Sequence, residues 1–194
     1  MSYLKELSMS FESYVARGDR FADAKKYELA LSEYQAAFEL DEDDVYKVQA
    51  LRSVAHAKKM LGLFPAAEAS LVRAIGLTKR GSFQNAILNR DLGELLLETP
   101  SRRQQAYERL LFSRRALFER GELLENAYAH ALIGRHYQID GDAHTAATHY
   151  WKALDYVRGR NEQYELQILL WLCEVSYVAR LTKQRRIRAL QQRF

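Results

Sequence analysis

The sequence has little of what β structure, disulfide frameworks and membrane spans require. Its 194 residues include two prolines and nine glycines, too little turn punctuation for a sandwich or barrel of many short strands. A single cysteine, Cys173, excludes a disulfide framework and any metal site built on several cysteines. No run of 18 apolar residues occurs, so we expect no membrane-spanning helix.

The first residues also lack the features of a secretory signal. Residues 1–7 contain no basic region followed by an apolar stretch, so we expect a cytoplasmic protein. Hydrophobic residues make up 48% of the chain and charged residues 28%. This balance is typical of a chain that buries a core rather than of a disordered one.

Apolar residues recur at helical steps along almost the whole sequence. Leu31, Tyr34 and Phe38, for example, lie three and four residues apart, as on one face of an α-helix. Glycine and proline interrupt these stretches, and three of the interruptions are followed by residues suited to cap a helix N-terminus: Ser82, Ser101 and Asp142. The sequence therefore predicts an all-α fold.

The helical stretches repeat one pattern. Counted from Gly18, Ala55 and Gly134, an alanine follows after 12 residues and a large residue after 16; these pairs are Ala30 and Tyr34, Ala67 and Leu71, and Ala146 and Tyr150. A further copy begins at Gly93, with one residue inserted in its turn. A small residue lets a second helix approach the first closely, and such units bury their apolar faces only by stacking.

One position departs from the pattern. Phe21 and Tyr137 lie three residues after Gly18 and Gly134, whereas Lys58 lies three residues after Ala55. Lys58 therefore replaces the aromatic residue that the pattern predicts in the second copy.

The pattern resembles the tetratricopeptide repeat family. The starting points are 37, 38 and 41 residues apart, longer than the family's ordinary period, and so resemble its long-helix variant. The resemblance implies a single domain, a right-handed α-solenoid of antiparallel helix pairs with a C-terminal capping helix or helix pair. We expect the repeats and the C-terminal helices at residues 11–44, 45–80, 82–120, 124–158 and 161–193.

The resemblance also implies a function, because the first helices of such repeats line a concave groove that binds a peptide or a partner helix. It predicts an adaptor, scaffold or regulator. The residues expected in the groove are Arg52, His56, Lys59, Ile87, Arg90, Tyr128, Arg135 and Gln138. Arginine makes bidentate contacts with carboxylates, so the three arginines predict an acidic partner. The alternative is that they are surface arginines, some of them paired with Glu94 or Glu174.

Charge is distributed unevenly along the chain. Residues 1–44 hold five basic and eleven acidic residues, although the whole chain has a net charge of +4. A basic patch near the other end, Lys183, Arg185, Arg186 and Arg188, supports an alternative function as a binder of RNA, DNA or a lipid surface. The modest net charge argues against nucleic acid. Opposite charges at the two ends also favour a homo-oligomer.

Catalytic and metal-binding patterns are missing. The sequence has no glycine-rich phosphate loop and no H-E-x-x-H motif. Its five histidines have no metal-ligand spacing, and Cys173 among Leu170, Trp171 and Leu172 is expected to pack as a small apolar residue. We therefore expect no enzyme activity, no cofactor and no metal.

Overall fold

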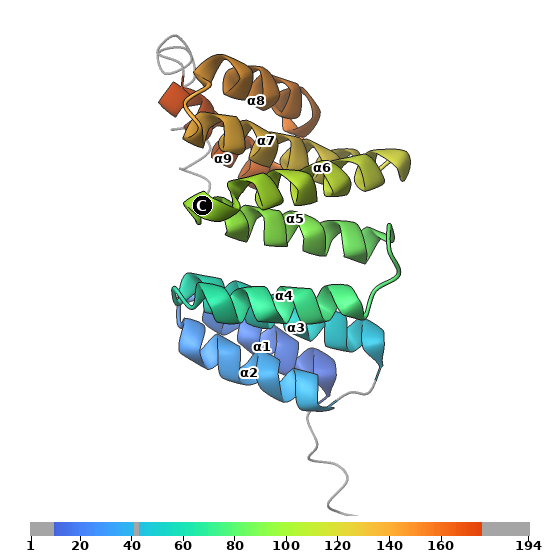
Figure 1. The fold of residues 1–194 in the computed structure, drawn as a ribbon. Helices are drawn as coiled ribbons and strands as arrows, with labels where there is room; N and C mark the ends of the chain where they lie inside the picture. Colours follow the sequence, from blue (N-terminus) through green and yellow to red (C-terminus); the bar gives the residue numbers. More distant parts are fainter. Residues whose placement is uncertain (1–9, 41–42, 176–194) are drawn as a thin grey trace, which may run out of the picture. The chain divides into compact units, whose positions relative to one another are not determined.

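The computed structural model describes residues 10–40 and 43–175, and every regular element in these ranges is a helix (Figure 1). This confirms the all-α fold class. The helices are α1 (Phe11–Asp23), α2 (Tyr27–Leu40), α3 (Asp44–Met60), α4 (Phe64–Gly76), α5 (Phe83–Leu97), the short 3-10 helix η1 (Pro100–Arg102), α6 (Arg103–Glu119), α7 (Leu123–Ile139), α8 (Ala143–Val157) and α9 (Glu162–Val175).

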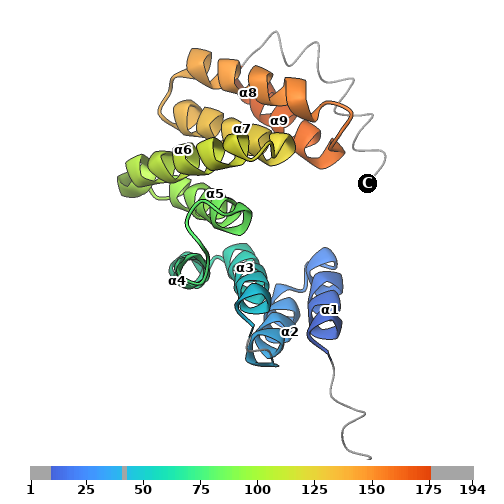
Figure 2. The same ribbon diagram turned by 90° about the vertical axis from the view of Figure 1, so that its right-hand side faces the viewer.

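The helices pack as sequential antiparallel pairs in two compact units. The first unit ends at Arg80 and contains the pairs α1–α2 and α3–α4, with α2 also against α3. The second begins at Gly81 and contains α5–α6 and α7–α8, followed by α9, with α6 also against α7 and α8 against α9. Figure 2 shows this succession within each unit. Each pair thus buries its second helix against the next pair of the same unit, as in stacked repeats.

Side-chain caps begin several of these helices. The Ser82 side chain accepts a hydrogen bond from the Asn85 backbone N–H at 3.2 Å, and Asp142 accepts one from Thr145 at 3.0 Å. These two predicted caps are confirmed. The prediction for Ser101 is wrong, because Ser101 lies inside η1 and α6 begins only after Arg102.

Three glycines lie at close contacts between paired helices, as the repeat pattern predicts. A Cβ atom on Gly134 would lie 2.8 Å from Cε1 of Tyr150, and one on Gly93 would lie 2.8 Å from Cγ of Leu110. A Cβ atom on Gly18 would likewise overlap the Tyr34 ring. Since real Cβ atoms do not approach other atoms so closely, only glycine allows these backbones and side chains to meet.

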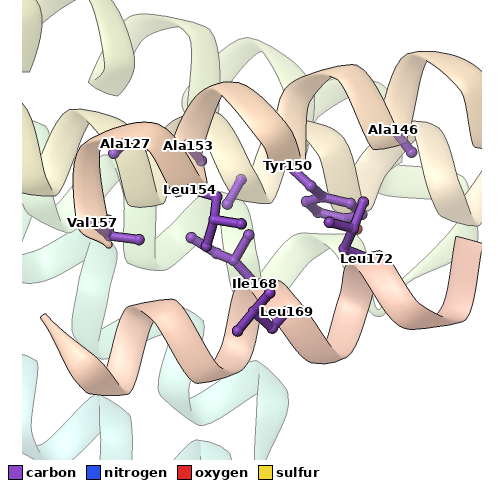
Figure 3. Packing of buried hydrophobic residues seen from close by; sticks show 10 residues of the cluster. Ala127, Ala146, Tyr150, Ala153, Leu154, Val157, Ile168, Leu169 and Leu172 are labelled. Atoms are coloured by element: carbon purple, nitrogen blue, oxygen red, sulfur yellow. The ribbon is translucent and has the colours of Figure 1, made fainter. Parts of the chain in front are cut away.

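A large apolar cluster holds the end of the second unit together. Figure 3 shows Tyr150, Leu154 and Val157 of α8 facing Ile168 and Leu169 of α9. Cys173 is partly buried and packs against this cluster. Among the described helices, none is long and apolar enough to cross a membrane.

Candidate interaction surface

The first helices of the second unit carry a connected row of polar and aromatic side chains. Helix α7 contacts both α5 and α9. Most of the polar and aromatic side chains concerned lie three, four or seven residues apart on their helix, as on one face, and Asp91 is next to Arg90 in α5. We call this row the ladder; it consists of Arg90, Asp91 and Glu94 of α5, Glu125, Tyr128, Arg135 and Gln138 of α7, and Tyr164, Trp171 and Glu174 of α9.

A buried arginine occupies one end of the ladder. Arg90 is only 3% exposed, and its guanidinium donates hydrogen bonds to Asp91, at 2.9 and 3.1 Å, and to Glu125. Burial lowers the pKa of Arg90, but Asp91 and Glu125 outweigh that effect and the pKa is raised. The guanidinium therefore stays charged, and its contact with Glu125 joins α5 to α7.

Aromatic rings form the middle of the ladder. The rings of Tyr128 and Tyr164 stack with centroids 4.3 Å apart and planes 12° apart, and Arg90 lies 5.2 Å from the Tyr128 centroid. The Tyr164 hydroxyl donates to Glu125 at 3.1 Å. Trp171 lies 6.3 Å from Tyr128. Burial raises the pKa values of both tyrosines, so the two phenols stay neutral at ordinary pH.

A second polar group forms the other end of the ladder. Arg135 and Gln138 both donate to one carboxylate oxygen of Glu174, at 2.9 and 2.6 Å. Gln138 also accepts a hydrogen bond from the Tyr150 hydroxyl. Trp171 lies 5.9 Å from the Tyr150 ring, so this group is continuous with the aromatic middle.

The ladder contains more acid than base. Its four carboxylates, Asp91, Glu94, Glu125 and Glu174, stand against Arg90 and Arg135. Both arginines contact carboxylates of the ladder itself. The named residues of the ladder therefore carry a net negative formal charge beside aromatic rings, which favours a partner with cationic side chains.

The predicted groove residues divide between the two units. The structure brings Arg90, Tyr128, Arg135 and Gln138 together in the ladder. Ile87, which the sequence also predicts in the groove, is instead buried: it is 4% exposed and packs with Ala86 and Leu117.

The other predicted groove residues belong to α3 of the first unit. Arg52 and His56 are exposed and Lys59 is partly exposed. Their spacing of four and three residues places them on one helix face, which we call the α3 stripe. The predicted basic patch, Lys183, Arg185, Arg186 and Arg188, lies outside the described residues.

Sequence reasoning misses Glu125, Tyr164 and Trp171. The periodicity places Tyr164 and Trp171 in an apolar stripe, and the repeat pattern predicts the inner face of the last helix at Gln167, Leu170 and Glu174. One signal could have found them. Tyr164 and Trp171 are seven residues apart, as are Tyr128 and Arg135, and residues at this spacing lie on the same face of a helix.

A pair of histidines also escapes the sequence pattern. His130 of α7 and His149 of α8 lie with their Nδ1 atoms 2.8 Å apart, and the Tyr137 ring stacks on His149. Burial, followed by the nearby His149 and Arg114 charges, lowers the pKa of His130 to about 4. The two histidines are 19 residues apart in the sequence, so their contact becomes visible only when α7 and α8 pack as an antiparallel pair. In the described part of the chain, no group of three or more His, Cys, Asp or Glu side chains is placed to hold a metal ion.

Comparisons with known proteins give fold likeness only. No family model matches the chain, and no curated protein is similar to it in sequence. BtubC (BKLC) from P. vanneervenii matches with a TM-score of 0.70 and 16% identity, over 94% of this chain and 77% of that one. A Rap protein complexed with Competence and Sporulation Factor matches with a TM-score of 0.77 and 18% identity, over 97% of this chain.

The Rap match covers 55% of the Rap chain, so this chain spans about half its length. TTC0263, a thermophilic TPR protein of Thermus thermophilus, matches with a TM-score of 0.61 and 17% identity, over 94% of this chain and 100% of that one. The chain therefore has the fold of tetratricopeptide-like repeat proteins over nearly its whole length.

Proposed function

We propose that the chain is a protein-interaction module, an adaptor, scaffold or regulator, that binds a peptide or a helix of its partner on the ladder. Tetratricopeptide-like repeat proteins generally mediate protein–protein interactions and are typically not enzymes. The observation that carries the proposal is the stack of Tyr128, Tyr164 and Trp171 between carboxylates. Tryptophan, tyrosine and arginine are the residues that most often dominate binding energy at interfaces.

The charge of the ladder decides which partner this face prefers. The sequence predicts an acidic partner from Arg52, Arg90 and Arg135, but two of these arginines are paired with carboxylates of the ladder. We therefore propose a partner segment with lysine or arginine beside an apolar anchor. An acidic segment is a second candidate, for the α3 stripe, where Arg52 and His56 are exposed.

A binding comparison tests the proposal. Short peptides that share aromatic and leucine anchors and differ only in charge are titrated against the wild type and against the double variant E94K/E174K. We expect the cationic peptides to bind the wild type and to lose about tenfold or more in affinity with the variant. The matched control is E108K/E119K, which makes the same change in charge at two exposed glutamates of α6 outside the ladder.

Two results would contradict the assignment of the ladder. One is equal affinity of the cationic peptides for the wild type and E94K/E174K. The other is binding of acidic peptides only, abolished by R52E and unaffected by E94K/E174K, which would assign the partner to the α3 stripe.

A further inference from the structure

The first unit contains a pocket between α2, α3 and α4. Its volume is about 280 Å³. Leu51 and Val54 of α3 form its apolar floor, Phe38 of α2 one wall, and Lys58, Ser70 and Arg73 its polar side. All these residues belong to one compact unit.

The sequence explains why this pocket is open. Lys58 and Ser70 occupy, in the second helix pair, the positions that Tyr137 and His149 occupy in the fourth, counted from Ala55 and Gly134. In the fourth pair, these rings stack with centroids 5.4 Å apart, and Tyr137 also contacts the Tyr107 ring. A lysine and a serine together have less side-chain volume than a tyrosine and a histidine, so they leave part of that space unfilled.

The polar groups of the pocket suit an anion. The Lys58 ammonium donates to the Ser70 hydroxyl at 3.0 Å, and that hydroxyl donates to the Ala66 carbonyl at 3.0 Å. An ammonium has three protons, so Lys58 retains donor capacity beyond this bond. The Arg73 guanidinium lies 4.4 Å from the Phe38 ring centroid. With Glu39 as the lining acid, the pocket has a net positive charge.

We propose that this pocket binds an apolar group that ends in a carboxylate, with Lys58 holding the carboxylate and Phe38, Leu51 and Val54 covering the apolar group. A free carboxylic acid and the C-terminal residue of a peptide both carry this chemistry. The site lies in the first unit, and the proposal does not rest on the function proposed for the ladder.

The test uses two acids and their neutral amides as probes: 3-phenylpropanoate with 3-phenylpropanamide, and N-acetyl-glycyl-phenylalanine with its C-terminal amide. Each is titrated into the full chain while the backbone amide signals of Leu51, Val54 and Ser70 are followed by NMR. We expect at least one acid to shift these signals and to bind about tenfold more tightly than its amide. Binding of the first acid alone assigns a free acid as the ligand, and binding of the second alone assigns a peptide C-terminus.

Two substitutions test separately the charge of Lys58 and the open volume of the pocket. K58Y restores the ring of the repeat pattern and should abolish binding, whereas K58M retains the length of the side chain and should weaken binding of the acid about tenfold. K59M is the matched control, because Lys59 does not line the pocket. The K58M result stands even if K58Y does not fold. Signals unmoved by either acid, equal affinity for acid and amide, or unchanged binding by K58M would overturn the proposal.

Discussion

At the scale of single residues, glycine allows close approach in three of the described helix pairs. Gly18, Gly93 and Gly134 face Tyr34, Leu110 and Tyr150, and each pair joins the first helix of a repeat to the second. The large residue fills the space that the missing side chain leaves. The contact therefore depends on both members of the pair.

Replacing Gly134 by alanine should destabilise the chain by about 2 kcal/mol, because the new Cβ would overlap the Tyr150 ring and force the helices apart. Chemical denaturation measures the loss. G76A is the matched control, since Gly76 also lies in a helix and a Cβ there would meet nothing within 4 Å. G134A as stable as G76A would contradict the close contact.

The His130–His149 pair predicts a pH dependence of stability. The pKa of His130 is about 4 in the folded chain, below the ordinary value of 6.5. Folding therefore favours the neutral form of the His130 imidazole. Its contribution to stability is complete above pH 6.5 and is lost as the pH falls toward about 4.

Thermal unfolding of the wild type and H130Q across this range tests the prediction. The wild type should lose more stability than H130Q as the pH falls, whereas H144Q, which changes an exposed histidine, should follow the wild type. Parallel pH profiles for the wild type and H130Q would show that the histidine pair does not titrate as described.

At the scale of helices, an ion pair between a buried arginine and a partly buried glutamate joins α5 to α7. The Arg90 side chain is 4% exposed and the Glu125 side chain 28%. Replacing Arg90 by methionine leaves Glu125 without this partner and should cost about 3 kcal/mol of unfolding free energy. R115M removes an exposed pair with Glu119 and should leave the unfolding free energy almost unchanged, because water screens that pair. Equal effects of the two substitutions in denaturant titrations would contradict the difference in burial.

The N-terminus of α5 provides a second prediction at this scale. S82A removes the side-chain acceptor for the Asn85 backbone N–H and should cost about 1 kcal/mol. S101A is the matched comparison, because Ser101 lies within η1 and caps no α-helix. The two variants are compared by thermal unfolding. A larger loss for S101A would support the cap expected from the sequence instead of the observed one.

The helices were predictable because their signals are local. Periodicity, the caps Ser82 and Asp142, and the small residues of the repeat depend on neighbours within one turn or one helix pair. The ladder was only partly predictable: Arg90, Tyr128, Arg135 and Gln138 follow from the repeat pattern. Tyr164 contacts Tyr128 and Glu125 of this group. The sequence does not predict these contacts, because a helical stripe does not show which of its aromatic residues faces a neighbouring helix.

At the scale of the whole molecule, the net charge of the chain differs in sign from the charge of the ladder. The net charge of +4 suggests an attraction for acidic partners. In the second unit, however, the ladder gathers four carboxylates around two paired arginines and three aromatic rings. The whole-chain charge therefore does not decide the partner's charge, because binding responds to the local field of the contact surface.

The two tryptophans allow the most direct test of the ladder as the binding surface. Trp171 lies in the ladder, and Trp151 is exposed on α8 outside it. The indole N–H signals of both are followed by NMR while a cationic peptide with an aromatic anchor is added. Binding at the ladder predicts that the Trp171 signal shifts in proportion to the bound fraction and that the Trp151 signal stays in place. A shift of Trp151 alone, or saturating binding that leaves Trp171 unmoved, would contradict the account.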